Sequence, residues 1–239
     1  MKELDDKVII YDDVCPMCQA YTAGFVRLGW LENRIGFADA PEKMLRQIDL
    51  DRARHEIPLL DTRTGEVIYG VDALSLILGK RMPFFKPLFQ NRLFRGAVRQ
   101  LYQIITYNRR IIAGSRAPET GFDCAPDVNL FYRCLYIGLA AITAAWMFRA
   151  NAGSPAWVSV ALPGLFALLL PAAFFTRKKL DFAGHWATVF LITALIISIL
   201  PGILAVKSAA AALAVAMSWK RWRLIRSQES VRRGEISSH

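Results

Sequence analysis

The 239-residue sequence predicts an α/β domain at the N-terminus followed by an all-α transmembrane helical region. Between residues 8 and 79, short β-branched or aromatic runs alternate with segments whose apolar residues recur at helical spacing, which favours α/β structure. Residues 130–219 instead hold only 6 basic and 1 acidic side chains among long apolar runs. We therefore expect a domain over residues 1–115, a linker over 116–129, about four transmembrane helices over 130–219, and a basic cytoplasmic tail over 220–239.

The first strand and helix are predicted around a Cys-x-x-Cys sequence. Residues 8–11 are β-branched or aromatic and have charge on both sides, which is typical of a buried strand. Pro16 suits the first turn of a helix, where a missing N–H costs nothing, so Cys15 lies at or next to the helix N-cap. There the unpaired backbone N–H groups and the helix dipole favour a thiolate over a thiol. We expect this helix to end near Asn33.

The following elements complete a small α/β layer. Residues 34–38 predict a second strand, which makes a right-handed βαβ unit with a parallel strand pair. Pro41 opens a helix. Residues 57–69 predict a β-hairpin whose turn is formed by residues 62–65. Residues 72–78 predict a third helix.

A basic, apolar segment follows this layer. Residues 91–112 predict an amphipathic helix that either covers the core or presses on membrane lipid.

The spacing of Cys15 and Cys18 lets their sulfurs close a small disulfide ring, which favours thiol–disulfide exchange. We expect Cys15 to be the exposed attacking thiolate and Cys18 the resolving thiol. Two alternatives stay open: half of a zinc site, and a pair of inert buried thiols. Zinc would need two more ligands, and the three histidines stand alone in the sequence: His55, His185 and His239.

These residues resemble a known family. The sequence Tyr11-Asp12-x-x-Cys15-x-x-Cys18 is similar to the motif of the DCC family, a group of thioredoxin-like predicted thiol-disulfide oxidoreductases. Gly70-Val71-Asp72-Ala73 and the stretch from Tyr102 through Asn108-Arg109 resemble further segments of that family. The resemblance covers about residues 7–115, and it implies a thioredoxin-like fold whose redox-active disulfide needs no bound cofactor.

One residue departs from the family pattern. Asp13 stands where the family commonly has glycine. A second acidic side chain beside the thiols would oppose thiolate formation.

Six residues are candidates for the site. We expect Cys15, Cys18 and Asp12 to be catalytic, with a buried Asp12 carboxylate of raised pKa exchanging a proton with Cys18. The alternative role of Asp12 is to cap the helix N-terminus. Pro58 is similar in placement to the cis-proline that faces the active site in thioredoxin-like folds, the alternative being an ordinary trans proline. The expected substrate-binding residues are Pro58, Tyr11 and Pro16.

The apolar C-terminal region predicts four membrane spans, each near the ~20 residues that cross a bilayer. They cover residues 130–148, 156–175, 186–200 and 203–219. Basic clusters follow the second and fourth spans, so the positive-inside rule puts both termini, and the thiol domain, in the cytosol. Alanine and glycine in the first and last spans favour close helix contacts, and hence a homo-oligomer through these helices.

Composition also bears on the partners. The net charge of +10 arises wholly outside residues 1–79, in segments next to apolar spans, which is typical of a cytoplasmic membrane face rather than of nucleic-acid binding. The first seven residues contain no apolar segment of the kind a secretory signal needs. The expected partners are therefore a protein or small-molecule disulfide substrate, a thiol reductant and membrane lipid.

Two further points concern alternatives. In the linker, Cys124 is the one other thiol that we expect in water, where it could exchange with the Cys15–Cys18 disulfide or remain a plain loop cysteine. The alternative for the whole chain is a non-enzymatic membrane protein whose N-terminal domain binds a partner, lipid or structural zinc.

Overall fold

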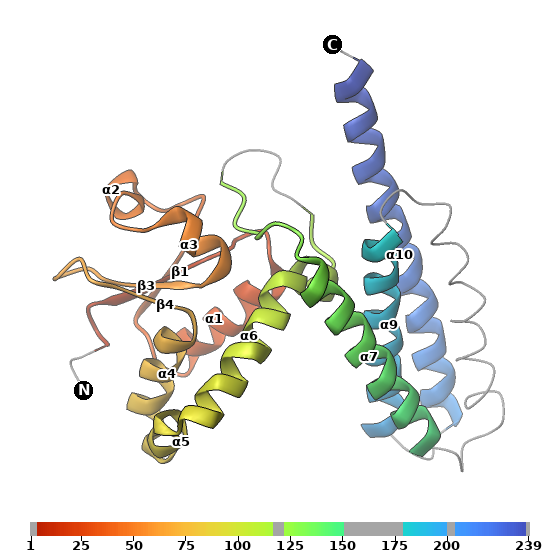
Figure 1. Cartoon of the computed structure of the whole chain (residues 1–239), viewed down its shortest axis with the longest axis horizontal. Coiled ribbons are helices and arrows are strands. Elements are labelled where there is room, and N and C mark those ends of the chain that lie inside the picture. The colour runs from red at the N-terminus through yellow and green to blue at the C-terminus, as the bar shows by residue number, and fades with distance from the viewer. Residues whose placement is uncertain (1–3, 117–121, 151–178, 200–203, 238–239) are drawn as a thin grey trace. The chain divides into compact units, whose positions relative to one another are not determined.

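The structure is a computed structural model, and it describes residues 4–116, 122–150, 179–199 and 204–237. The chain divides into two compact units, Met1–Asn129 and Leu130–His239 (Figure 1). Each is described separately below.

The N-terminal unit is built on a four-stranded mixed sheet. Its strands are β1 (Lys7–Tyr11), β2 (Asn33–Gly36), β3 (Pro58–Asp61) and β4 (Val67–Tyr69), in the order β2-β1-β3-β4. β1 pairs in parallel with β2 and antiparallel with β3, and β3 pairs antiparallel with β4. The predicted βαβ unit and the predicted β-hairpin are both confirmed.

Six α-helices and one 3-10 turn connect and cover these strands in the described part of this unit. They are α1 (Pro16–Arg27), α2 (Glu42–Leu45), α3 (Leu50–His55), α4 (Gly70–Arg81), η1 (Pro83–Phe85), α5 (Lys86–Gln90) and α6 (Arg92–Ala113). The prediction that the first helix reaches Asn33 is wrong. Gly29 adopts a φ of 66° directly after the helix, a left-handed conformation that glycine tolerates, and Asn33 already belongs to β2.

Helices cover both faces of the sheet, because successive side chains of a strand point to opposite sides. Ile9 and Leu59 pack on one face with side chains of α1 and α4. Ile10 and Leu60 pack on the other face with side chains of α2 and α3 and with Phe122 (Figure 1). The sheet is therefore the middle layer of the unit.

The C-terminal unit is helical where it is described. It contains α7 (Leu130–Ala150), α9 (Lys179–Ile199) and α10 (Leu204–Ser237). By length and composition, α7 and α9 could each cross a membrane. Buried helices of soluble proteins pass the same test, so a multi-pass topology stays a prediction. The predicted span over residues 156–175 lies outside the described residues. The helix that contains the fourth predicted span continues unbroken through the predicted tail as far as Ser237.

Candidate active site

The two cysteines lie at the start of α1, as predicted. Cys15 is the N-cap residue, with φ −90° and ψ 109°, and Pro16 occupies the first turn. Cys18 follows one turn later, and its carbonyl oxygen accepts a hydrogen bond of 2.7 Å from the Thr22 hydroxyl. Both cysteines are in the free thiol form.

The expectation that Cys15 is exposed is wrong. Cys15 is 1 % exposed and Cys18 is 4 % exposed. α6 packs against α1. Residues 122–125 are in turn held to α6 by the hydrogen bond that Arg109 donates to the Cys124 carbonyl oxygen. The thiol pair is thus covered by segments that come much later in the sequence.

The two thiols have strongly different acidities. The Cys18 thiol donates a hydrogen bond to the Cys15 sulfur, which lowers the pKa of Cys15 to about 6, and the same bond raises the pKa of Cys18. Burial and the Asp12 carboxylate oppose ionisation of Cys15, whereas the positive charge of Arg109 favours it. At neutral pH, Cys15 is therefore the thiolate and Cys18 the thiol.

Asp12 forms a buried ion pair with Arg109 of α6. Their side chains are each 12 % exposed, and Asp12 Oδ2 lies 3.3 Å from Arg109 Nη2. Asp12 Oδ1 accepts a hydrogen bond of 3.1 Å from the Val14 N–H, in the turn before α1. Both bonds of the Asp12 carboxylate go to groups outside α1, so the alternative in which Asp12 caps this helix is wrong. Its carboxylate instead fixes the turn and anchors α6.

The Asp13 carboxylate points away from the Asp12–Arg109 ion pair. Its Oδ2 accepts a hydrogen bond of 3.1 Å from the Ala38 N–H. A Cβ atom at Gly36 would lie only 3.0 Å from Asp13 Cβ, so glycine provides the space for this arrangement. Asp12 is the carboxylate that raises the pKa of Cys15.

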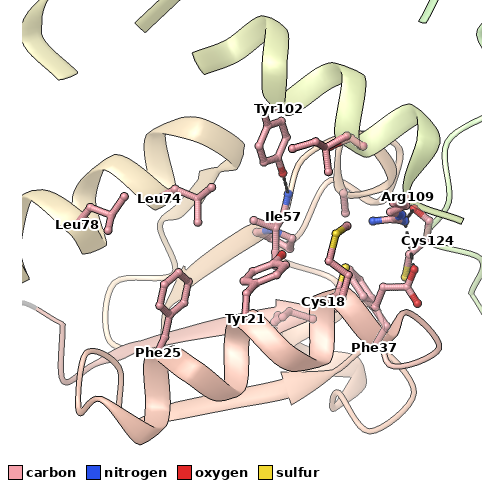
Figure 2. A pocket seen from close by; sticks show the side chains of 17 residues that line it. Cys18, Tyr21, Phe25, Phe37, Ile57, Leu74, Leu78, Tyr102, Arg109 and Cys124 are labelled. Carbon is pink, nitrogen blue, oxygen red and sulfur yellow. Dashed lines mark hydrogen bonds and ion pairs between the residues drawn. The ribbon is translucent and has the colours of Figure 1, made fainter. Parts of the chain in front are cut away.

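A pocket with a volume of about 360 Å³ opens beside the thiol pair (Figure 2). It lies between α1, α4 and α6, at the end of the sheet where β1 stops and β3 begins. Three of the predicted site residues line it: Asp12, Cys18 and Pro58. The peptide bond before Pro58 is trans, since no cis peptide bond occurs in the described chain.

Tyr11, Pro16 and Cys15 do not line this pocket. Along β1 the side chains alternate, so Ile10 and Asp12 line the pocket whereas the Tyr11 ring packs under Arg34, with 4.8 Å between the guanidinium carbon and the ring centre. Pro16 instead occupies the first turn of α1. The predicted contacts of Tyr11 and Pro16 with substrate are therefore not supported at this pocket.

The sequence reasoning gave no site role to Arg109 and Tyr102, which border the pocket. It considered Cys124, which also borders the pocket, only as an exposed thiol of the linker. The Tyr102 hydroxyl accepts a hydrogen bond of 2.9 Å from the Ile57 N–H, next to Pro58 (Figure 2). Arg109 and Tyr102 belong to the helix segment that resembled the DCC family, and this could have identified them.

Cys124 had no such signal, and its predicted exposure to water is wrong. It is 3 % exposed and lies in the core cluster that contains Ile10 and Phe37. Next to it, the Phe122 ring lies 5.2 Å from the Phe37 ring. Burial raises the pKa of Cys124. Residues 122–125 are thus part of the folded N-terminal unit rather than a free connection.

The zinc alternative finds no ligand set in the described parts of the chain. No group of three or more histidine, cysteine, aspartate or glutamate side chains there could hold a metal ion. His55 Nδ1 lies 3.0 Å from the Asp51 carbonyl oxygen, and His185 is hydrogen-bonded to Arg221 in the C-terminal unit. His239 lies outside the described residues.

Comparison with known proteins agrees with the motif. Residues 9–115 match the family model of the DCC1-like thiol-disulfide oxidoreductases. No curated protein and no solved structure matches the chain. The match begins within β1, contains both thiols and ends just after α6. The resemblance to the DCC family is therefore confirmed over residues 9–115, which are just under half of the chain.

Proposed function

We propose that this chain is a membrane-anchored thiol-disulfide oxidoreductase that reduces disulfides through Cys15 and Cys18. The family match supports redox function in general. The observation that carries the roles of the two cysteines is the hydrogen bond from Cys18, which lowers the pKa of Cys15 to about 6. A thiolate beside a protonated thiol is the arrangement from which disulfide exchange starts. The reducing direction is part of the proposal and does not follow from this pKa.

In the proposed reaction, the Cys15 thiolate attacks one sulfur of the substrate disulfide. A mixed disulfide forms, and the other substrate sulfur leaves as a thiolate. Cys18 then loses its proton and attacks the Cys15 sulfur, which releases the second substrate thiol and leaves a Cys15–Cys18 disulfide. Asp12 lines the same pocket as Cys18 and is the group proposed to accept that proton. A thiol reductant returns the pair to the dithiol form.

The membrane part of the proposal rests on α7, α9 and the charge distribution. We place the N-terminal unit and the C-terminus on the cytoplasmic side, because the basic clusters flank apolar segments. Residues 80–115 contain eight basic and no acidic side chains, and Phe84 and Leu93 are 67 % and 86 % exposed. This composition suits contact with anionic lipid headgroups. A homo-oligomer would form through the apolar helices. Protease protection of N- and C-terminal tags in sealed vesicles tests the orientation.

The redox function is tested with the full chain in detergent micelles. The reduced protein is mixed with insulin, oxidised glutathione and dipyridyl disulfide, and mass spectrometry detects the Cys15–Cys18 disulfide. In a chain that also carries Cys134→Ser, Cys15→Ser should abolish the reduction of every substrate. Cys134→Ser alone is the matched control, because Cys134 is an exposed thiol in the other unit, and it should leave formation of the Cys15–Cys18 disulfide unchanged. If the unaltered protein forms no Cys15–Cys18 disulfide with any of them, the proposed function is wrong.

One observation favours the non-enzymatic alternative, in which the thiols are structural. Both residues are buried, at 1 % and 4 % exposure. Labelling of Cys15 with a thiol probe at neutral pH, together with metal analysis, separates the two functions. Labelling within minutes and no bound zinc support the reductase, whereas unlabelled thiols in the native protein or one zinc per chain support the alternative.

A further inference from the structure

The pocket beside the thiols is walled mainly by apolar side chains. Phe25 of α1 faces Leu74 and Leu78 of α4 (Figure 2), and Ile105 and Tyr102 of α6 also line the pocket. Ile57 and Pro58 line it from the start of β3. An apolar group that enters this space loses contact with water, which favours its binding.

The polar groups of the pocket are largely occupied by each other. The Tyr102 hydroxyl binds the Ile57 N–H, and the charge of Arg109 is balanced by Asp12 at 3.3 Å. A charged substrate would lose its hydration there without gaining a free partner of opposite charge, which disfavours carboxylates and ammonium groups. Arg109 Nε is buried and has no hydrogen-bond partner among the described residues, so it is a single free donor on a guanidinium whose charge Asp12 already balances.

Size and access restrict the substrate further. The volume of about 360 Å³ is at the lower end of the range for small-molecule sites. Because both cysteines are buried, a folded protein cannot bring its disulfide to them without opening the unit. A small molecule inside the pocket, by contrast, contacts Cys18, whose thiol is hydrogen-bonded to the sulfur of the attacking Cys15.

We infer that the substrate is a small disulfide with uncharged, apolar substituents, bound between Phe25, Leu74 and Leu78 with its sulfurs beside Cys18. This inference rests on the proposed function and names its substrate class. The dithiol gives up two electrons: Cys15 bonds to one substrate sulfur as the substrate S–S bond breaks, and Cys18 then displaces that sulfur. The Cys15–Cys18 bond forms, and the two product sulfurs are protonated by the proton that Cys18 releases and by one proton from solvent.

The test measures single-turnover reduction of two small disulfides by the reduced full chain. All proteins carry Cys134→Ser, because that exposed thiol would also react. Dipyridyl disulfide is neutral and aromatic, and oxidised glutathione is charged and polar. Each rate is divided by the rate of the same disulfide with dithiothreitol, which removes the difference in intrinsic reactivity. The corrected preference for dipyridyl disulfide should be about tenfold or more.

Leu74→Gln should lower this preference about fivefold or more, because it puts an amide into the apolar wall. Leu76→Gln is the matched control: Leu76 is on the same helix and is similarly half-buried, but it does not line the pocket. It should leave the preference unchanged.

Each other outcome overturns a defined part of the argument. Equal corrected rates for the two small disulfides, or equal effects of the two leucine variants, would overturn the substrate class and leave the oxidoreductase intact. Faster reduction of insulin than of both small molecules would assign the pocket to apolar side chains of protein disulfides, and would also overturn it. If no disulfide oxidises the Cys15–Cys18 pair, the proposed function itself fails.

Discussion

Each unit of this chain buries an arginine, and the two arginines have different surroundings. Arg109 in the N-terminal unit and Arg133 in the C-terminal unit have side chains that are 12 % and 7 % exposed. Arg109 pairs with Asp12 beside two thiols and a pocket. Arg133 of α7 pairs with Asp181 of α9 at 3.4 Å and joins two helices. A similar ion pair can therefore tune a reactive group in one unit and hold helices together in the other.

The thiols of the two units also differ in their surroundings. Cys15 and Cys18 are buried together and are hydrogen-bonded, whereas Cys134 of α7 is exposed. The N-terminal unit thus combines low exposure with high ionisation at one sulfur. The following predictions test whether the hydrogen bond and charges around Cys15 cause this difference in ionisation between the two units.

The largest effect should come from removing the hydrogen bond between the thiols. In the unaltered chain, alkylation of Cys15 should rise as the pH increases through about 6 and then level off, because the thiolate is the reactive form. Cys18→Ala should move this rise toward the ordinary pKa of 9.0. Mass spectrometry of the Cys15 peptide measures the profile, and Cys134 should give the same profile in both proteins. An unshifted Cys15 profile would contradict the assigned hydrogen bond.

The next effect should come from Arg109→Gln. It leaves the Asp12 carboxylate buried without its cation, which costs about 3–5 kcal/mol of folding free energy. It should also raise the pKa of Cys15, because the guanidinium favours the thiolate. Urea unfolding and the alkylation profile measure the two effects.

Arg133→Gln is the matched change in the other unit. It removes a similarly buried arginine, but it should leave the alkylation profile of Cys15 unchanged. A profile that shifts equally in both variants would show that the shift reflects general destabilisation instead.

A smaller effect is expected for Cys124→Ser. The substitution puts a hydroxyl into the core cluster with Ile10 and Phe37, at a cost of about 2 kcal/mol. Cys124→Ala should keep the full rate of disulfide reduction, because the proposed reaction uses only Cys15 and Cys18. Loss of turnover in a folded Cys124→Ala protein would instead favour a relay through this thiol.

The smallest effect should come from Tyr102→Phe. The variant removes the acceptor of the Ile57 N–H and should lower the unfolding free energy by about 1 kcal/mol. Tyr11→Phe keeps the aromatic ring under Arg34 and should change stability less. Thermal unfolding of the two variants gives the comparison.

The parts of the site that the sequence predicted are those with local causes. The strand before Cys15 and the proline after it act within one turn of chain, so the N-cap position of Cys15 was predictable. The hairpin around Gly65 was predictable for the same reason: glycine there takes a φ of 76°.

The parts that could not be predicted depend on contacts between distant segments. The pairing of Asp12 with Arg109 and the return of residues 122–125 over the sheet follow from tertiary packing, which leaves no periodic signal in the sequence. The side to which Tyr11 points depends on the register of β1, and a shift by one residue reverses it. The burial of Cys15 was missed because α6 and Cys124 had not been placed near it.

The burial of Cys15 has a consequence for the lifetime of the protein. Thiolates are the form that peroxide converts first to sulfenic and then irreversibly to sulfinic acid, and exposure governs how fast this happens. Cys15 is ionised at neutral pH and yet only 1 % exposed. Diffusing oxidants therefore have little access to the Cys15 sulfur. The thiolate can remain reactive without being lost to irreversible overoxidation.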